Sequence, residues 1–270
     1  MSNTTAGTSN AISTNSDPLW ETLRARARIV SSEEPSLAPL LDEFVLIHPT
    51  FEKALALRLS AKLVYHSERG GHLHDMFSEA YESDKSICQN VRRDLEAIME
   101  RDPACDSVLT PFLWFKGFQA LTCHRVAHWL WNNNRQHFAR YLQSMVSEVF
   151  AVDIHPAARL GGGILLDHAT GFVAGETAVI EDNVSILHDV TLGGTGKEKG
   201  DRHPKVRRGV LIGAGAKILG NIEIGECSKI GAGSVVLQSV PPHSTAAGVP
   251  AVIIGEAREE SPSLTMDHCI

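Results

Sequence analysis

The chain has 270 residues, of which 43% are hydrophobic and 21% charged, a composition typical of a folded globular protein. Its formal net charge of −7 at pH 7 argues against non-specific binding to nucleic acid. The five cysteines are scattered without a C-x-x-C pair, which argues against a disulfide framework and a thiolate zinc site and favours the reducing cytoplasm.

The N-terminal segment, residues 1–17, is polar and low in complexity. It has neither a basic residue nor an apolar run, so we predict no secretory signal or transit peptide. We expect this segment to be disordered.

Residues 18–149 carry helical patterning and predict an all-α domain. Residues 50–63 (TFEKALALRLSAKL) are helix-forming throughout. Three asparagines at 132–134 predict a break between two helices. One helix face carries four apolar residues at spacings of four, four and three: Ile87, Val91, Leu95 and Ile98.

The most apolar stretch of the chain covers residues 111–131 (PFLWFKGFQALTCHRVAHWLW). It contains Lys116 and Arg125, so we predict a buried helix and no membrane span.

Residues 150–253 follow a six-residue rhythm in which an aliphatic residue opens most units, as at Ile154, Leu160 and Leu166. Two extra residues follow the Leu166 unit, and a break containing GGTGKEKGDRHPK precedes the resumption at Ile212. One unit cannot bury its own apolar side, so the units must stack into a solenoid with a shared core. Units three apart should then lie one above another. Residues 254–270 have no such rhythm and predict a flexible C-terminal tail.

These repeats resemble the left-handed parallel β-helix of the hexapeptide acyltransferases. The left hand is implied by the resemblance, since the general rule for parallel crossovers would favour the right. Such prisms usually assemble as trimers, with active sites in the grooves between neighbouring subunits. The fold class expected is therefore an N-terminal helical domain followed by a left-handed parallel β-helix.

The helical domain together with DIHPAARLGGGILLDHATG, GGTGKEKGDRHPKV and AAGVPA closely resembles the serine acetyltransferase family, over roughly residues 18–253. The resemblance implies transfer of acetyl from acetyl-CoA to L-serine, the first step of cysteine biosynthesis from serine. It implies direct chemistry in a ternary complex, acetyl-CoA as co-substrate, no permanently bound cofactor, and inhibition by L-cysteine. The alternatives are another hydroxyl acceptor (homoserine or a sugar) and a non-catalytic subunit that only binds a partner.

His168 is the predicted general base. Acyl transfer to a hydroxyl needs a base near neutral pH, and the family's catalytic histidine occupies this position in LDHATG. The structural alternative is a histidine hydrogen-bonded within the coil. Asp153 is the predicted partner that fixes the ring's tautomer, with a cap at the junction of helix and prism as its alternative.

The predicted serine site is a clamp for a zwitterion. In the family, aspartates matching Asp102 and Asp167 hold the substrate ammonium, although Asp102 precedes a proline and could simply cap a turn. Arg202 suits bidentate contact with the substrate carboxylate. His203 matches a family active-site histidine, to which we assign a contact with that carboxylate and a second role in helping the base.

The cations of residues 197–208 suit the phosphates of coenzyme A, although a solvated loop is the ordinary role of such a charge run. The resemblance adds a set of cofactor contacts. These predicted positions are Gly193, Gly194, Ala214, Lys229, Ala247 and Gly248.

Three histidines on the prism, His155, His168 and His188, raise the alternative of a zinc site. A catalytic zinc needs three ligands that converge on one centre. The family role of His168 and the prolines or acidic residues beside the other two argue against it, and we predict no metal.

The C-terminal sequence AREESPSLTMDHCI ends in Ile270, an apolar residue with a free carboxylate. A frayed terminus is the ordinary interpretation. In the family, a C-terminal isoleucine docks into O-acetylserine sulfhydrylase, so we expect Ile270 to bind that enzyme. Both a trimer and a pair of trimers are compatible with the sequence.

Overall fold

The computed structural model describes residues 17–63, 71–196 and 199–269. The predicted disordered N-terminus, except Asp17, and Ile270 lie outside these ranges. The helices before the prism are α1 (Pro18–Glu33), α2 (Ala38–Leu41), α3 (Phe51–Leu63), α4 (Gly71–Ser83), α5 (Lys85–Arg101), α6 (Leu109–Trp114), α7 (Lys116–Asn132) and α8 (Gln136–Phe150), with short helical turns η1 (Pro35–Leu37) and η2 (Asp42–Leu46).

The strands and last helix are β1 (Val152–Ile154), β2 (Arg159–Leu160), β3 (Leu165–Leu166), β4 (Phe172–Ala174), β5 (Val179–Ile180), β6 (Ser185–Ile186), β7 (Thr191–Gly193), β8 (Lys205–Val206), β9 (Leu211–Ile212), β10 (Lys217–Leu219), β11 (Glu223–Ile224), β12 (Lys229–Ile230), β13 (Val235–Val236), β14 (Ser244–Gly248), β15 (Ala251–Glu256) and α9 (Pro262–Thr265).

The helical periodicity of residues 87–98 is confirmed, because all four apolar residues of that face are buried on α5. The asparagine break is confirmed as well, since α7 ends at Asn132 and α8 begins at Gln136.

The apolar stretch 111–131 differs from the prediction, because two helices share it. The backbone of Phe115 is extended (φ −82°, ψ 108°), which ends α6 and lets α7 start in a new direction. The change brings Gly117 against the prism, where a Cβ would lie 2.0 Å from the carbonyl oxygen of Leu166. No helix of the described residues has the length and apolar character that crossing a membrane requires.

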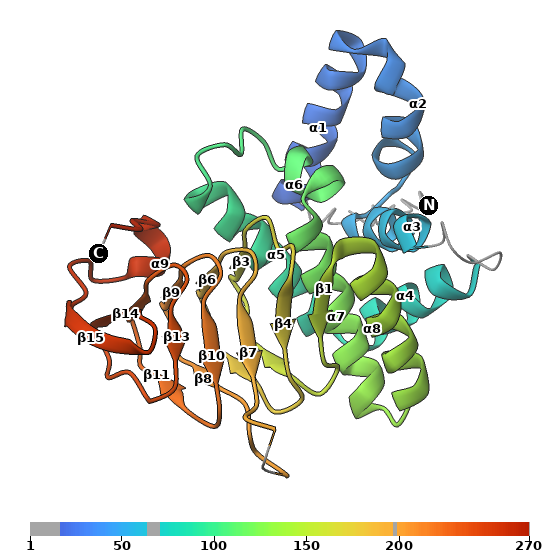
Figure 1. Ribbon diagram of the computed structural model, residues 1–270. Helices are drawn as coiled ribbons and strands as arrows, with labels where there is room; N and C mark the ends of the chain where they lie inside the picture. The colour runs from blue at the N-terminus through green and yellow to red at the C-terminus, as the bar shows by residue number, and fades with distance from the viewer. Residues whose placement is uncertain (1–16, 64–70, 197–198, 270) are drawn as a thin grey trace, which may run out of the picture.

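The hexapeptide rhythm folds into a triangular prism of three parallel sheets (Figure 1). Sheet A has the order β1-β4-β7-β10-β13, sheet B β11-β8-β5-β2, and sheet C β14-β12-β9-β6-β3 with β15 added at its edge. From β1 to β10 each strand therefore pairs with the strand three elements later, and the opening aliphatic residues, such as Ile186 and Ile212, stack in the interior. The predicted helical region followed by a parallel β-helix is confirmed.

The two extra residues after the Leu166 unit lie in the turn between β3 and β4. The chain takes eight residues from Leu165 to Val173, but six between their strand partners, Ser185 and Thr191. This corner of the prism is consequently longer than the corner stacked on it.

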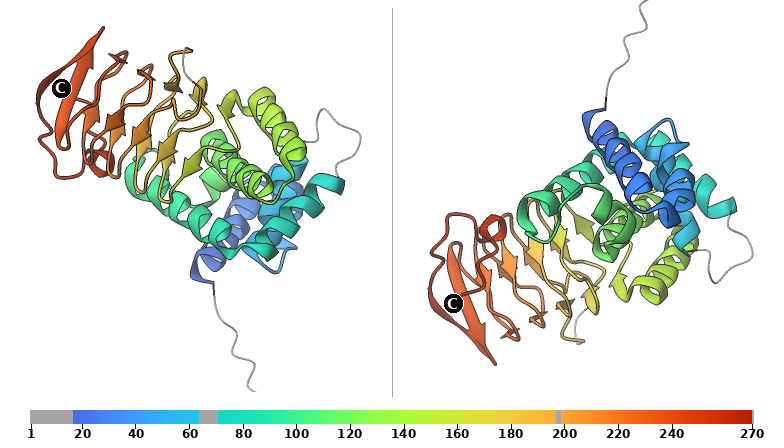
Figure 2. Two further views of the ribbon diagram at one scale, coloured as in Figure 1. Left: turned by 90° about the horizontal axis from the view of Figure 1, so that it is seen from below. Right: turned by 90° about the horizontal axis from the view of Figure 1, so that it is seen from above.

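Charged residues from α5 and α7 fasten the helices to the first coil. The buried guanidinium of Arg125 donates to the buried carboxylate of Asp94 at 2.6 Å and to the carbonyl of Gly161 at 2.7 Å. Asp94 in turn accepts from the backbone N–H of Ile164 at 2.9 Å, and Arg101 donates to the carbonyl of Gly163 at 3.0 Å. Figure 2 shows the helices gathered around the β1 end of the prism, away from the β14–β15 hairpin.

Candidate active site

A cleft of about 490 Å³ lies where the helices meet the prism, and it contains three predicted site residues: Asp102, Asp167 and His168. They come from two places in the fold: Asp102 from the end of α5, and Asp167 and His168 from the β3–β4 turn. The remaining lining residues come from α5, α6, α7, β3 and the segment between α5 and α6: Ile98, Ala104, Thr110, Trp114, Phe115, Lys116, Gly117, Phe118, Leu165 and Leu166.

The His168 side chain is accessible from the cleft, with 72% of its surface exposed. Its Nε2 lies 3.6 Å from Oδ2 of Asp167, which is beyond hydrogen-bonding distance. The ring of His188, one coil further along, packs edge-on at 5.9 Å between centroids. Neither contact is a hydrogen bond that fixes the His168 ring within the coil. This favours the role of general base over that of a structural histidine.

Asp153 lies on β1 in sheet A, opposite Val173 of β4. Its Oδ1 accepts a hydrogen bond from Nε2 of Gln143 on α8 at 2.7 Å. Among the described residues it makes no hydrogen bond with His168, so their pairing stays a prediction.

Asp102 caps a turn, which was its alternative structural role, and it also lines the cleft. It follows the last residue of α5, and its Oδ1 accepts from the backbone N–H of Ala104 at 2.9 Å. One carboxylate can cap the turn through that oxygen while it faces a ligand in the cleft. Asp167 is half-buried and lines the same cleft from the β3–β4 turn.

Arg202 and His203 lie at a different corner of the prism. Both precede β8 in the loop that joins sheet A to sheet B, whereas His168 lies between sheets C and A. In Figure 1 that loop lies at the lower edge of the prism and the β3–β4 turn at its upper edge. Within one chain the structure therefore does not bring the two halves of the predicted clamp together.

Arg202 is held by the turn after β4. Its Nη2 contacts Oε2 of Glu176 at 2.7 Å, and its backbone N–H donates to Oγ1 of Thr177 at 3.0 Å. The hydrogen bond from Arg202 holds the pKa of the Glu176 carboxyl below its usual range. Glu176 thus aligns the guanidinium of Arg202, and a substrate carboxylate would compete with Glu176 for it.

His203 is buried, with 7% of its surface exposed. Its Nδ1 accepts from the backbone N–H of Thr177 at 3.2 Å, which leaves the ring proton on Nε2. Gly175 makes room for that edge of the ring, since a Cβ there would lie 2.0 Å from Nε2. Burial, followed by the charge of Arg202, lowers the pKa of His203 and favours a neutral imidazole.

The predicted cofactor residues divide between the same two corners. Gly193 ends β7 and Gly194 packs against Arg202, both on the side of the loop. The other four lie on or next to strands of sheet C: Ala214, Lys229, Ala247 and Gly248.

The last residues of the chain cover one of these positions. Lys229 is 3% exposed, and its Nζ lies 3.2 Å from a carboxylate oxygen of Glu259 and donates to the carbonyl of Cys269 at 2.9 Å. His268 and Ala214 line the same small cavity of about 100 Å³. Upstream, Ser263 on α9 is buried, and its carbonyl accepts from Oγ of Ser185 at 2.8 Å.

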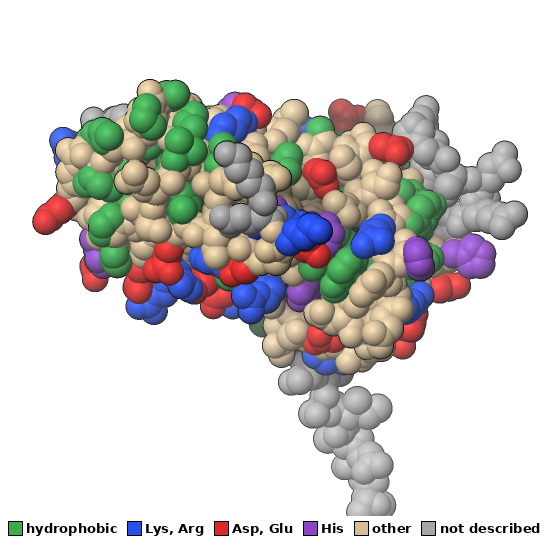
Figure 3. All heavy atoms as spheres, turned by 60° about the horizontal axis from the view of Figure 1, so that its bottom comes forward, with side chains coloured by type: hydrophobic (Ala, Val, Ile, Leu, Met, Phe, Trp, Pro, Cys, Tyr) green, Lys and Arg blue, Asp and Glu red, His purple; other side chains and the backbone are tan. Residues whose placement is uncertain are grey.

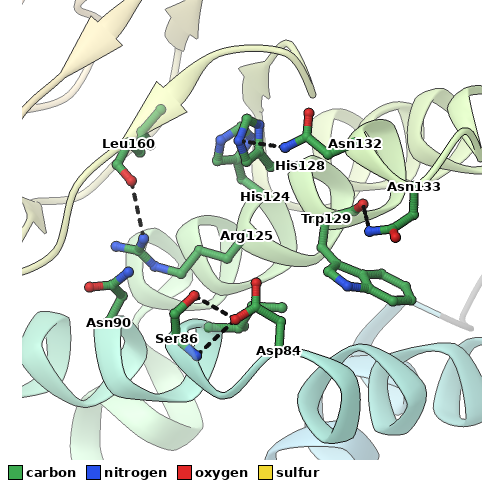
Figure 4. A pocket seen from close by; sticks show the side chains of 11 residues that line it. Asp84, Ser86, Asn90, His124, Arg125, His128, Trp129, Asn132, Asn133 and Leu160 are labelled. Carbon is green, nitrogen blue, oxygen red and sulfur yellow. Dashed lines mark hydrogen bonds between the residues drawn. The ribbon is translucent and has the colours of Figure 1, made fainter.

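A second cavity, of about 180 Å³, lies between α5, α7 and β2 and contains no predicted site residue (Figure 4). His128 in its wall contacts the carbonyl of Pro156 through Nδ1 at 2.7 Å and the amide of Asn132 through Nε2 at 3.0 Å. The neighbouring His124 is buried, and its Nδ1 has no hydrogen-bond partner among the described residues. Within the described ranges, no group of three or more His, Cys, Asp or Glu side chains could hold a metal ion.

Sequence reasoning missed several residues that hold the site in place. Gln143 contacts Asp153, Glu176 aligns Arg202, and Thr177 fixes His203. Lys116, which the sequence singled out for its charge alone, donates to Oγ1 of Thr170 beside His168. The two residues of each contact are far apart in the sequence, so no local sequence pattern could predict the contact.

Two family profiles match the chain: "Serine acetyltransferase, N-terminal" over residues 19–123, and "Bacterial transferase hexapeptide (six repeats)" over residues 203–238. The chain is 53% identical to the serine acetyltransferase of Salmonella typhimurium over 250 residues, which cover 93% of this chain and 92% of that protein.

Two solved structures are similar throughout. A serine acetyltransferase of Brucella abortus in complex with coenzyme A superimposes with a TM-score of 0.87 at 54% identity and covers 89% of this chain and 96% of that one. A serine acetyltransferase in complex with cysteine gives a TM-score of 0.91 at 50% identity, with coverage of 93% and 98%.

Proposed function

The chain belongs to the serine acetyltransferase family, and we propose that it transfers acetyl from acetyl-CoA to L-serine in a site built from the cleft at His168 and the loop at Arg202. The reaction gives O-acetyl-L-serine and coenzyme A. The observation that carries the assignment is the cleft itself, where an accessible imidazole lies beside two carboxylates.

His168 acts as the general base. It removes the proton of the serine hydroxyl as the oxygen attacks the thioester carbonyl of acetyl-CoA, and the thiolate of coenzyme A leaves when the tetrahedral intermediate collapses. Asp102 and Asp167 hold the substrate ammonium close to this base. Asp153 accepts a hydrogen bond from the other ring nitrogen of His168 and fixes its tautomer, and no covalent enzyme intermediate is needed.

Arg202 binds the serine carboxylate through a bidentate contact, which replaces its contact with Glu176. The neutral His203 contributes an Nε2–H donor to the same carboxylate. Acetyl-CoA runs along Gly193 and Gly194 on one side and Ala214, Ala247 and Gly248 on the other. It reaches Lys229 when the C-terminal residues that cover this lysine are displaced.

A homotrimer would join the two halves, because one corner of a prism can face a different corner of its neighbour. Large hydrophobic side chains remain exposed toward the C-terminal end of the prism, where Figure 3 shows them gathered. These are Leu237, Val249, Val252, Ile253 and Ile254. These exposed side chains support an interface with a further copy of the chain. Two trimers could in turn pair into a hexamer.

Cysteine competes with serine in this proposal. It has the same ammonium and carboxylate and a thiol in place of the hydroxyl, so the clamp can hold it. The cysteine complex of a similar enzyme supports this assignment.

The C-terminal isoleucine is proposed to bind O-acetylserine sulfhydrylase. Ile270 lies outside the described residues, and the support comes from its side chain and free carboxylate, which a site built for an amino acid can capture.

A thiol-release assay tests the function. Purified protein with acetyl-CoA should release coenzyme A with L-serine and much more slowly with homoserine or a sugar. Release with a sugar alone would assign the other acceptor class, and no release with any hydroxyl compound would leave a non-catalytic binding role.

A further inference from the structure

The turn that carries His168 has an unusual backbone. His168 and Ala169 have φ of 55° and 59°, and among the described residues this is the one place where two successive non-glycine residues are left-handed. L-residues disfavour this conformation because Cβ approaches the following carbonyl oxygen. The turn is also two residues longer than the one stacked on it, and contacts outside the turn must maintain the conformation.

The hydrogen bonds inside the turn are short-range. The N–H of Ala169 donates to the carbonyl of Asp167 at 2.6 Å, and the N–H of Thr170 to that of His168 at 2.7 Å. From the next coil, the N–H of Asp189 donates to the carbonyl of Thr170 at 2.7 Å. The ends of the turn are held as well, because the N–H of Asp167 donates to the carbonyl of Ile186 and the N–H of Gly171 to the carbonyl of Ala151, each at 2.8 Å. Between these ends, Thr170 is a residue through which the next coil holds the turn.

The helical region adds one side-chain contact at the same residue. Lys116 is the first residue of α7, and its ammonium donates to Oγ1 of Thr170. A cation at the start of a helix opposes the helix dipole, so local helix energetics do not account for a lysine there. The close approach of Gly117 to the carbonyl of Leu166 keeps the start of α7 against the turn, within reach of Thr170.

We propose that Lys116 is a positioning residue, which holds the Asp167–Gly171 turn so that His168 points at the serine hydroxyl. This inference rests on the proposed role of His168 as the base. The contact acts on the orientation of the base. The ammonium clamp stays in place, because Asp102 lies outside the turn and Asp167 is anchored by its own N–H, which donates to the carbonyl of Ile186 at 2.8 Å. Loss of the Lys116 contact should therefore lower kcat and change the KM for serine little.

The experiment compares Lys116→Met, Lys116→Arg, Thr170→Val and the double variant Lys116→Met/Thr170→Val by steady-state kinetics. Lys116→Met and Thr170→Val should each lower kcat by about ten- to a hundred-fold, the range expected for a small displacement of a reacting group. The double variant should lose no more than either single variant, and Lys116→Arg should recover most of the rate. All variants should keep the wild-type melting temperature to within a few degrees.

A rise in the KM for serine without loss of kcat in Lys116→Met, with Thr170→Val unaffected, would overturn the proposal and make Lys116 a substrate contact. Hydrogen–deuterium exchange over residues 165–175 measures directly whether Lys116 holds the turn, independently of whether His168 is the base. Faster exchange in Lys116→Met with unchanged kcat would also overturn the proposal. Full activity of His168→Ala would instead remove the base on which both depend.

Discussion

At the scale of single residues, the cleft contains the imidazole of His168, which is 72% exposed, and the carboxylates of Asp102 and Asp167. One oxygen of Asp102 caps a turn, and Asp167 lies just beyond hydrogen-bonding distance of the ring. The base is therefore free to receive a proton, and the carboxylates are free to receive an ammonium.

His168→Ala should lower kcat by about 10²- to 10⁴-fold, the usual contribution of a general base, because the serine hydroxyl stays protonated during attack. The KM for serine should change less. His243→Ala, at an exposed turn near the other end of the prism, is the matched control. Near-normal turnover of folded His168→Ala would remove this residue from the mechanism.

Arg202→Ala should raise the KM for serine, because it removes a charge-assisted contact worth about 1.5–3 kcal/mol. Glu176→Gln, which removes only the anion that aligns Arg202, should have a smaller effect. An unchanged KM for serine with a sharply raised KM for acetyl-CoA would assign Arg202 to the cofactor.

Asp102→Asn should weaken serine binding and cysteine inhibition together, since both ligands present the same ammonium. Initial rates over a grid of serine and cysteine concentrations measure both. Loss of serine binding with intact cysteine inhibition would indicate two separate sites.

At the scale of elements, we expect the interface between α7 and the prism to lose stability in acid. Burial lowers the pKa of His124 well below its usual value. In the unfolded chain this residue takes up a proton below about pH 6.5, whereas the folded protein resists protonation. Its contribution to stability is therefore present above that pH and is lost as the pH falls below it.

His124→Gln should flatten the fall in the free energy of unfolding between pH 7 and pH 5.5, by on the order of 1 kcal/mol. Chemical denaturation at a series of pH values measures it, with the exposed His137→Gln on α8 as the control. His155 and His203 also have lowered pKa values, so some slope should remain. Equal slopes in the two variants would contradict a role for His124.

The elements differ in how far the sequence could predict them. The hexapeptide rhythm reports burial directly, since each opening aliphatic residue points into the prism, and so the solenoid could be predicted. The bend at Phe115 could not, because it depends on the approach of Gly117 to the carbonyl of Leu166, a contact that adjacent residues do not encode. For the site, the motifs predicted residue types and their family roles. They could not show that His168 and Arg202 lie at different corners, because that depends on the sheet in which each strand pairs.

At the scale of the whole molecule, one chain presents the proposed serine site as two separate halves. The residues proposed as base and ammonium clamp lie at the corner between sheets C and A, and the residues proposed to hold the carboxylate lie between sheets A and B. The exposed hydrophobic side chains toward the C-terminal end give a second reason for association with further copies.

Deleting Ile270 should abolish binding to O-acetylserine sulfhydrylase and leave acetyl transfer nearly intact. Calorimetric titration of the peptide TMDHCI into the sulfhydrylase, with a peptide lacking the isoleucine as control, measures the first part. Absence of binding at millimolar peptide would make the tail an ordinary chain end.

The most direct test of the shared site is complementation between two inactive chains. His168→Ala and Arg202→Ala chains, each with its own affinity tag, are co-expressed, and the mixed assemblies are purified through both tags. If each site takes His168 from one chain and Arg202 from its neighbour, every mixed trimer has one complete site out of three, and about a third of wild-type turnover should return. Turnover no higher than that of the two single variants would contradict the account, because it would mean that both residues of each site come from the same chain.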